Sequence, residues 1–359
     1  MFMQIHTLTS YHATLLNRDE AGLAKRIPFG NSPRLRISSQ CLKRHWTEKL
    51  RDVLELPHGF RTRHFFSREV LRRLVEKEGI DDDLAQALVK ELINILIKKK
   101  EGKKEKTTGD LLMLQQPALF GKPEADFLVK ILKQCTSTRN EKKALESLKR
   151  KLKTEQKNYR ALLRQAGCDD LYAGIEGALF GRFVTSDILA RSDACVHVAH
   201  ALTVHALDTE VDYFTVVDDL SREKETGAAH AGDMELGAGV YYGYVVVDVP
   251  LLISNLSGCD PKEWKNQQTQ DASTILTALV KTIATVSPGA KLGSTAPYAY
   301  SDFVLLEAGP QQPRSLANAY LYARPTDGDD TQVAVDAMGR HVKALEEMYG
   351  KTADARSAA

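Results

Sequence analysis

Cationic and short polar side chains crowd into one stretch of the chain, "RLRISSQCLKRHW" at residues 34–46. Two arginines alternate with aliphatic residues, which is typical of a strand, and Ser38 and Ser39 then open a segment with apolar residues at helical spacing. The pattern therefore places hydroxyl, amide and cationic groups at a helix N-terminus, where unpaired backbone N–H groups and the helix dipole favour anions. Such a site could hold a small phosphate ligand, an acidic protein partner or a nucleic-acid backbone.

The net charge of +2 conceals two regions of opposite charge. Residues 18–73 contain fourteen Lys/Arg against six Asp/Glu, whereas residues 208–235 contain nine acidic against two basic residues. This asymmetry indicates a polyanionic partner, self-association through opposite patches, or both. Cations mixed with short polar donors suit a phosphate backbone that is bound without regard to its sequence. The basic set near the predicted strand end and helix start is Arg18, Lys25, Arg26, Arg34, Arg36, Lys43 and Arg44.

Three histidines in "VHVAHALTVH" form a second candidate site, for a metal ion or a general base, with acidic residues following at positions 208, 210 and 212. On a strand His197 faces away from His200, and on a helix His205 does not join the other two cleanly. The H-E-x-x-H pattern is absent. The spacing therefore favours histidines packed in or beside a sheet over a metal site.

The glycine-rich segment "GAGVYYG" at residues 237–243 is close to a dinucleotide-binding fingerprint but departs from it. Its third glycine falls one position late, and the segment continues as a strand rather than a helix. The phosphate-loop pattern G-x-x-x-x-G-K-[ST] does not occur in the chain. Glycines at the entry of a strand or at a bulge explain the segment better, and no cofactor is expected.

A third candidate is Asp19 in "TLLNRDE", directly after the first predicted strand. A carboxylate beside Arg18 could serve a metal-dependent nuclease, but such enzymes normally need more than one carboxylate on their metals, and Asp19-Glu20 is the only local pair. A turn stabilised by the aspartate side chain is therefore favoured, with Arg18 left to meet a phosphate.

The composition bounds the class of protein. A chain of 359 residues with 43% hydrophobic content can bury one large core or form two to three domains. Five scattered cysteines without a C-x-x-C pair favour a reducing compartment and argue against a structural zinc site. Neither an N-terminal signal nor a run of eighteen apolar residues is seen, so the sequence predicts a soluble cytoplasmic protein with no membrane partner.

The hydrophobic patterns predict an α+β fold with the order β-α-β-β-α-β, which is ferredoxin-like or RRM-like with an antiparallel sheet. A long helical stretch follows the first helix, and the tail "TADARSAA" is expected to be disordered. The predicted elements are strand 2–9, helix 39–55, helical insertion 56–170, strand 178–185, insertion 187–236, strand 238–248, helix 268–286 and strand 301–308.

Six motifs in order resemble the CasC family, the backbone subunit of the type I-E CRISPR Cascade complex in antiviral defence. They are "LNRD", "RLRISSQCLKR", "GRFVTSD", "AHALTVHALDTEVDYFTVVDD", "GVYYGYV" and "SLANAY". The resemblance covers residues 2–55 and 176–320. It implies an RRM-like palm at 1–55 and 176–320, helical fingers at 56–170, a thumb loop at 204–236, and a C-terminal helical segment and tail at 321–359.

The resemblance also implies a function. Members of the family stack head to tail into a helical filament along a CRISPR RNA, and each thumb reaches its neighbour and kinks the RNA. The implied partners are the CRISPR RNA, the target DNA strand paired to it, further copies of the chain and other Cascade subunits. The implied RNA-facing residues are Arg18, Lys25, Ser38, Ser39, Gln40, Lys43, Arg44, Phe183, Thr185, Ser186, Tyr213 and Phe214.

Two positions depart from the family pattern. Phe183 stands where the family has methionine, and an aromatic ring there can still stack on or wedge against a base. Thr47 stands where the family can carry a basic residue, so that role falls to Lys49 or is lost.

The sequence therefore predicts a non-catalytic RNA-binding structural subunit. Two rival hypotheses stay open: a metal-dependent endoribonuclease that uses Asp19 with other carboxylates, and a monomeric RNA-binding module that forms no filament.

Overall fold

The computed structural model describes residues 1–96, 112–114, 116–136, 140–155, 171–182, 192–216, 230–325 and 330–359. The chain forms two compact units, which are considered separately. The first comprises Met1–Leu54, His197–Val249 and Ser273–Ala359, and the second comprises Glu55–Val196 and Pro250–Ala272. The predicted α+β class with a mostly antiparallel sheet is confirmed.

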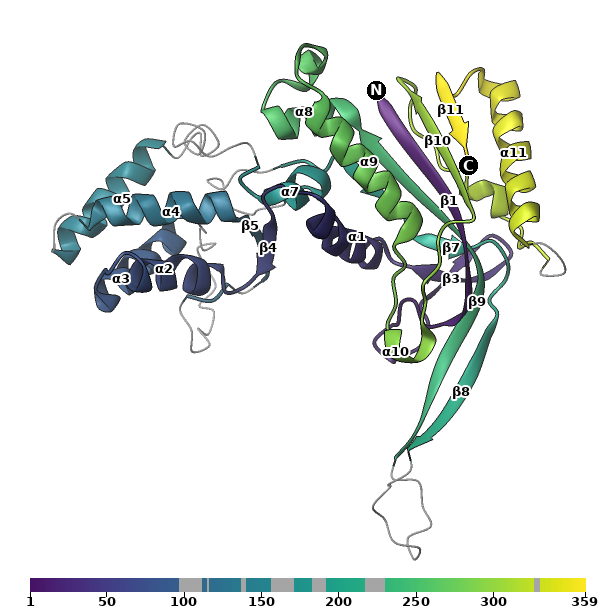
Figure 1. Ribbon diagram of the computed structural model, residues 1–359, viewed down its shortest axis with the longest axis horizontal. Coiled ribbons are helices and arrows are strands. Elements are labelled where there is room, and N and C mark those ends of the chain that lie inside the picture. Colours follow the sequence, from purple (N-terminus) through teal and green to yellow (C-terminus); the bar gives the residue numbers. More distant parts are fainter. Residues whose placement is uncertain are drawn as a thin grey trace, which may run out of the picture. The chain divides into compact units, whose positions relative to one another are not determined.

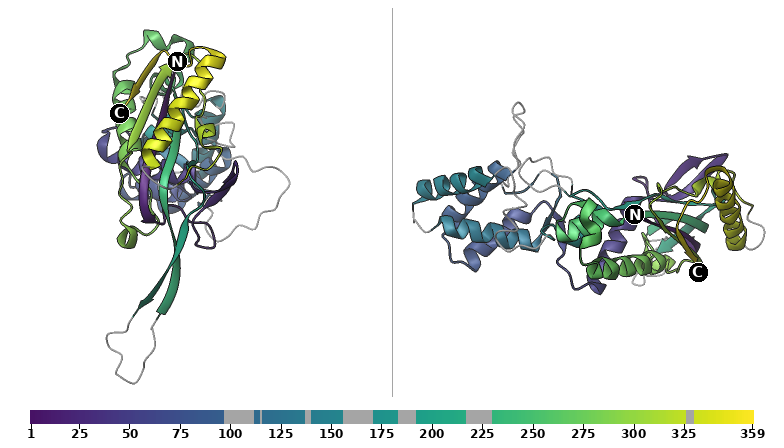
Figure 2. Two further views of the ribbon diagram at one scale, coloured as in Figure 1. Left: turned by 90° about the vertical axis from the view of Figure 1, so that its right-hand side faces the viewer. Right: turned by 90° about the horizontal axis from the view of Figure 1, so that it is seen from above.

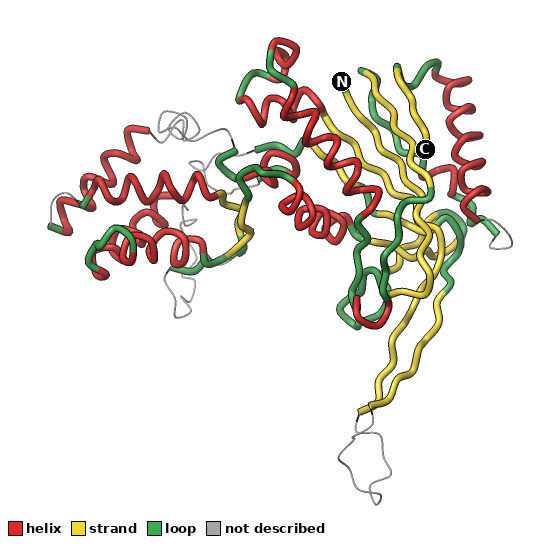
Figure 3. Tube along the Cα trace, in the orientation of Figure 1, coloured by secondary structure: helices red, strands yellow, loops and turns green. Residues whose placement is uncertain are grey.

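A nine-stranded sheet forms the frame of the first unit (Figures 1 and 3). Its main path runs β11-β10-β1-β9-β7-β3-β2, with antiparallel pairing at each step, and β6 and β8 also pair with β9. The strands are β1 (Phe2–Thr14), β2 (Arg26–Phe29), β3 (Ser32–Ile37), β6 (Val196–Val198), β7 (Ala201–Thr203), β8 (Thr209–Val216), β9 (His230–Asp248), β10 (Phe303–Gly309) and β11 (Ala355–Ala358).

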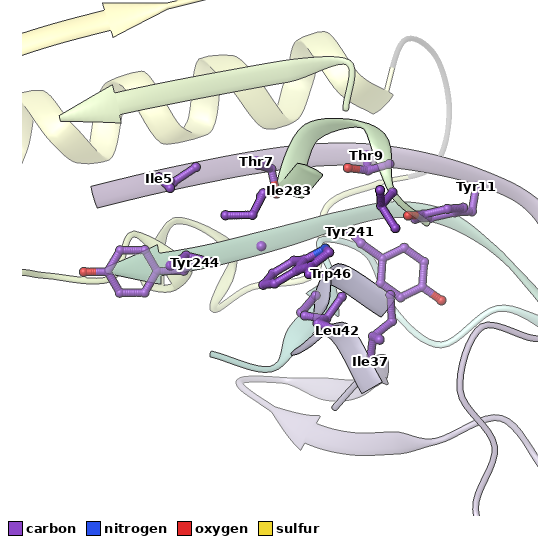
Figure 4. A pocket seen from close by; sticks show the side chains of 14 residues that line it. Ile5, Thr7, Thr9, Tyr11, Ile37, Leu42, Trp46, Tyr241, Tyr244 and Ile283 are labelled. Atoms are coloured by element: carbon purple, nitrogen blue, oxygen red, sulfur yellow. The ribbon is translucent and has the colours of Figure 1, made fainter. Parts of the chain in front are cut away.

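Side chains of β1 alternate between the two faces of this sheet, because successive strand residues point in opposite directions. Ile5, Thr7, Thr9 and Tyr11 face α1 (Ser39–Val53) and α9 (Gln270–Thr285) (Figure 4). Leu8 faces the other way, into a core formed with the short helix η3 (Ala317–Tyr320) and α11 (Asp330–Tyr349). The central strand is therefore covered on both faces.

A small cavity lies between the sheet and α1 and α9, lined by Thr7, Trp46, Tyr241 and Ile283 among others (Figure 4). Its volume is about 30 Å³. That volume fits a water molecule and is far too small for a nucleotide or an organic cofactor.

The glycines of "GAGVYYG" lie in β9 at an irregularity in its pairing with β1, where the register shifts between Tyr11 and Thr14. Gly239 has φ +133°, and a Cβ atom there would lie 1.7 Å from Nε2 of His205. Only glycine fits this position, since an L side chain would be strained and would collide with the buried imidazole. Of the two predicted explanations, the entry of a strand and a bulge, the second agrees with this irregularity: the glycines of β9 lie opposite the extra residue of β1.

The second unit has a helical core with a two-stranded sheet, β4 (Gly59–Thr62) and β5 (Ala118–Gly121). Phe65, Phe66 and Phe120 pack ring to ring at its centre. The remaining elements are the π-helix η1 (Phe66–Leu71), α2 (Arg72–Glu76), α3 (Asp82–Leu96), α4 (Lys122–Cys135), α5 (Glu141–Glu155), α7 (Gly174–Phe180), α8 (Val249–Ser257) and η2 (Pro261–Asn266).

A buried ion pair crosses this second core. Nη1 of Arg182 donates to both carboxylate oxygens of Glu124 at 3.1 and 3.0 Å, and the guanidinium lies 4.9 Å from the ring centroid of Phe120. Glu124 stands in the first turn of α4, where the helix dipole favours a negative charge. The pair thus fixes Arg182, the residue before Phe183, inside the fold.

Several sequence predictions are wrong. Residues 178–180 end a helix, α7, instead of starting a strand, and the strand that precedes β9 in the sheet is β7. Glu176 of α7 accepts a hydrogen bond from Gly59 N–H, which attaches 174–180 to the second unit rather than to the predicted palm. Residues 250–272 also belong to that unit, and Asn255 donates to Ala178 O.

Three element boundaries also differ from the prediction. β9 begins at His230 instead of 238, because β8 pairs with its first half. The helical insertion contains the strands β4 and β5. The tail expected to be disordered forms β11, which pairs with β10 through Ala355–Ala358.

A buried charged cluster holds this C-terminal strand on the sheet. The carboxylate of Glu307 on β10 accepts hydrogen bonds from Arg314 at 2.6 and 2.9 Å and from Arg356 on β11 at 2.7 and 2.9 Å. His6 on β1 lies 3.3 Å away, and its Nδ1 is 2.9 Å from Tyr242 Oη. Burial would raise the pKa of Glu307, but His6 and the two arginines outweigh it and hold this pKa far below its usual 4.5.

The cluster predicts acid sensitivity of the first unit. Burial lowers the pKa of His6 below its usual 6.5, so the unfolded chain binds that proton first and the free energy of unfolding falls as the pH drops below about 6.5. Protonation of Glu307 removes further stability below pH 4.5. Denaturant titrations between pH 8 and about 4, a range set by the usual pKa values of His and Glu, should show both losses of unfolding free energy. His6→Gln should reduce the loss that begins below about pH 6.5. His200 and His341, whose pKa values burial also lowers, add to the same slope, and an unchanged slope in His6→Gln would contradict the assignment to His6.

Candidate functional site

The basic segments meet around the N-terminus of α1. Asn17 Oδ1 accepts from Ser38 N–H at 2.9 Å, and Asn17 O accepts from Lys25 N–H at 2.8 Å. Lys25 O in turn accepts from Arg36 N–H at 2.8 Å. These backbone and amide bonds tie the loop after β1, the end of β3 and the start of α1 into one surface, as the sequence pattern predicted.

The helix start itself is built by Ser38. Its backbone is extended, its side chain is buried, and its Oγ accepts from Cys41 N–H at 3.3 Å as the N-cap. No acidic residue occupies the first turn, so the positive end of the helix dipole is not neutralised there. Ser39 and the exposed Gln40 lie at the surface of this first turn, with Ser39 Oγ 3.4 Å from Gln40 Oε1. Ser38 thus shapes the site, whereas Ser39 is partly exposed and Gln40 is exposed.

The structure separates the basic residues into two groups, and the side chains of the first group already have partners within the described residues. Arg34 is fully buried and donates to Thr203 O at 3.3 Å and Tyr320 O at 3.0 Å. Arg26 binds the carboxylate of Glu235 at 2.6 and 2.8 Å. The exposed Arg44 pairs at 2.6 Å with Glu48, one helical turn away.

In the second group, Arg18, Lys25 and Arg36 form no ion pair with any carboxylate of the described residues. Lys25 lies near the first turn of α1: burial raises the pKa of the Cys41 thiol, and the charge of Lys25 opposes that rise. These three cations, the unneutralised helix start and the outward polar side chains can together hold consecutive phosphates.

Arg36 and His200 are functional candidates outside the set of RNA-facing residues implied by the motifs. Arg36 Nη1 lies 3.1 Å from His200 Nδ1, and Arg36 pairs with Leu202 across β3 and β7. The pKa of His200 is lowered by burial and by the charges of Arg36 and Lys25, so the neutral imidazole accepts from Arg36 and orients it. The alternation "RLRI" places Arg34 and Arg36 on the same face of β3, so the sequence carries no local signal that separates the partly exposed Arg36 from the buried Arg34.

The three histidines do not gather. His197 lies in β6, His200 contacts Arg36, and His205 packs against Gly239 with its Nδ1 2.7 Å from Ala206 O. No group of three or more potential metal ligands occurs among the described residues.

Asp19 closes a turn. Its Oδ1 accepts from Ala21 N–H at 2.9 Å and from Leu23 N–H at 3.0 Å, and its backbone pairs with Leu23 O and Gly22 N–H. This is the turn that the sequence favoured, and it leaves Arg18 exposed beside it.

The described parts of the acidic region, residues 208–216 and 230–235, lie in a hairpin of β8 and β9 that extends beyond the rest of the sheet (Figures 1 and 2). Its two aromatic residues point to opposite faces. Tyr213 is 68% exposed, on the same face as the exposed Val211. Phe214 packs over Gly232 on the paired strand, and Lys291 Nζ lies 5.0 Å from its ring centroid. The two rings therefore have different environments, and of the two Tyr213 is the one that is mostly exposed.

Phe183, Thr185 and Ser186 lie outside the described residues. Lys43 and the neighbouring Thr47 are half-buried on α1, and Lys49 is exposed two residues further along the helix. In the part of the chain that the structure describes, no helix is long and apolar enough to cross a membrane.

Comparisons with known proteins agree with the sequence motifs. A model of the CT1975-like protein family matches residues 3–359. A chain of a "CRISPR RNA-guided surveillance complex, pre-nicking" is 25% identical, with a TM-score of 0.74 over 100% of this chain and 90% of that one. A chain of a "CRISPR RNA-guided surveillance complex" is 19% identical, with a TM-score of 0.55 over 100% and 88%, which shows likeness of fold. No curated protein matches. The family and the first structure confirm the resemblance to Cascade subunits.

The site predicts different roles for the adjacent serines. Ser38→Ala removes the cap of α1 and should lower the free energy of unfolding by about 1 kcal/mol. Ser39→Ala removes only an outward hydroxyl and should change it by less than about 0.5 kcal/mol. Chemical denaturation of the two variants measures this difference, and equal losses would show that Ser38 does not cap the helix.

Proposed function

The chain belongs to the CT1975-like protein family, and we propose that it is a non-catalytic subunit of a CRISPR surveillance complex that binds the CRISPR RNA backbone. The observation that carries this proposal is the surface around the start of α1, where Arg18, Lys25 and Arg36 form no ion pair with a described carboxylate. A guide-binding protein must hold phosphates and leave base edges free to pair. Cations, hydroxyls and helix-end amides meet that requirement.

The arrangement of the first unit supports an RRM-like palm. In chain order β1, α1, β7, β9, α9 and β10 follow the β-α-β-β-α-β succession, and in the sheet β1 lies between β9 and β10. Both helices cover one face of this sheet (Figure 4). The proposed RNA surface lies where β3 ends and α1 starts.

We further propose that the chain assembles head to tail with copies of itself and presents the guide to a target DNA strand alongside other subunits. The hairpin carries exposed carboxylates at Asp208, Glu210, Asp212 and Asp233. These charges suit a neighbour's basic surface, and a contact that joins two different patches without closing a ring propagates into a helix.

The endoribonuclease alternative depends on Asp19, and the observed hydrogen bonds favour a structural role for it. Both of its backbone partners lie within its own turn. Asp19→Asn keeps a side-chain acceptor for those bonds, so cleavage of target RNA in the presence of Mg²⁺ that is lost in this variant would overturn the non-catalytic proposal.

The cations predict a specific salt dependence of RNA binding. Arg18→Ala, Lys25→Ala and Arg36→Ala should each weaken binding of single-stranded RNA and reduce the slope of log K against log salt by roughly one. Arg44→Ala is the matched control, because Glu48 already compensates this arginine, and its slope should change little. Fluorescence anisotropy at several salt concentrations gives the slopes.

The same series separates backbone binding from base reading. The losses should be equal for RNAs of different sequence, because phosphates carry no sequence information. Losses that depend on RNA sequence would contradict the backbone model, whereas an equal slope change in Arg44→Ala would show that Glu48 does not withhold this arginine from the RNA.

From its exposure on the hairpin we expect Tyr213 to act between subunits. Tyr213→Ala removes an exposed ring, so the free energy of unfolding should change by less than about 0.5 kcal/mol while assembly along a full-length guide falls. Phe214→Ala removes the ring packed over Gly232 and should loosen the hairpin itself. Size-exclusion chromatography with and without CRISPR RNA measures assembly.

Val211→Ala, on the same exposed face, is the control, and it should assemble along the guide more fully than Tyr213→Ala does. Normal assembly by Tyr213→Ala would remove this residue from the contact, and loss of the folded monomer would show that its ring belongs to the core.

A further inference from the structure

A segment between α9 and β10 holds two exposed tyrosines on a fixed backbone. Ser287 Oγ donates to Ala299 O at 2.7 Å and accepts from Ala299 N–H at 3.0 Å. Ser301 N–H donates to Ala284 O at 2.7 Å. These bonds fasten the chain to the end of α9 on both sides of Tyr300, so its course is fixed by specific bonds.

The two rings point outward from this fixed backbone. Tyr298 and Tyr300 are 73% and 72% exposed, whereas Pro297 is buried and Ala299 half-buried between them. Both rings are therefore available to a partner, while the residues beside them hold the segment against the fold. Just before them, Ala296 has φ +39°, the only positive φ of a non-glycine residue among the described residues. Such backbone strain concentrates at functional positions.

The charge around the tyrosines favours an anionic partner. Residues 272–301 contain two lysines and no Asp or Glu. The next carboxylate, Asp302, accepts from Ser10 N–H at 2.7 Å and is thus engaged with β1. A phosphate backbone can therefore pass this segment without meeting a carboxylate from it.

The segment is continuous with the proposed RNA surface. Ala290 N–H donates to Leu15 O at 2.9 Å, three residues before Arg18, and His12 Nε2 lies 3.1 Å from Thr295 O. Lys291, at the start of α10 (Leu292–Thr295), lies over the ring of Phe214 on the hairpin. The segment of the tyrosines thus lies next to the proposed RNA surface and also contacts the hairpin that the proposed function assigns to the contact between subunits.

We propose that Tyr298 and Tyr300 form a stacking platform for an unpaired base of a single strand held by this subunit. The proposal rests on the proposed function, because the cations around α1 supply the backbone grip. Aromatic rings bind the face of any base, so stacking needs no particular sequence and leaves the pairing edge free. A fixed segment with two rigid rings loses little conformational entropy when a base docks.

The test uses the full chain and an unstructured single-stranded RNA that carries a fluorescent adenine analogue at successive positions. Wild type should quench the analogue at one or more positions, as stacking does. The variant Tyr298→Ala/Tyr300→Ala should lose this quenching and bind at least about fivefold more weakly, with its salt slope unchanged. Tyr298→Phe/Tyr300→Phe should keep the quenching and the affinity of wild type, because stacking needs the ring and not the hydroxyl.

Tyr349→Ala is the matched control, since Tyr349 is also 73% exposed but ends α11, beyond the other face of the sheet. Wild-type affinity and quenching in the double alanine variant would overturn the platform while leaving the slopes of the cation variants, and so the proposed function, intact. An altered oligomeric state of the double variant without RNA would overturn it in favour of a protein contact. Absence of RNA binding by wild type would overturn both proposals.

Discussion

The pairing of β1 on both of its edges is the constraint on which the first unit depends. β1 is antiparallel to β9 and to β10, so its register with two partners is fixed and its side chains must alternate between two covered faces. One face receives α1 and α9, and the other receives η3 and α11. Because β1 runs directly into the loop of Asn17 and Arg18, the same pairing delivers that loop to the start of α1.

Electrostatic compensation decides which basic residues remain available on this frame. Arg34 is buried and donates from both terminal nitrogens to carbonyl oxygens, and Arg26 and Arg44 have carboxylate partners. A paired cation releases fewer counterions on binding a polyanion, because its own partner already neutralises part of its charge. The proposed RNA surface therefore depends on few side chains, and on a helix start that lacks acidic residues.

Other buried charges in the two units hold the fold and lie outside the proposed RNA surface. Glu307 gathers His6, Arg314 and Arg356, and by doing so keeps the last strand on the edge of the sheet. In the second unit, Glu124 and Arg182 compensate each other inside an aromatic core. Removing one partner of such a pair leaves an uncompensated charge out of water, which is why these residues suit structural roles.

The sequence by itself determined the α+β class, the helix at 39–53, the glycines at an irregularity of the β1–β9 pairing and the meeting of polar and basic groups at a helix start. These follow from local period, capping and glycine geometry. It also carried the motifs of the family. Only the tertiary structure decided that 174–180 is helical, that the tail is a strand, that Arg34 is buried and that Arg36 contacts His200. These outcomes depend on partners more than a hundred residues away in the chain, or on an edge strand whose pairing partner no local pattern identifies.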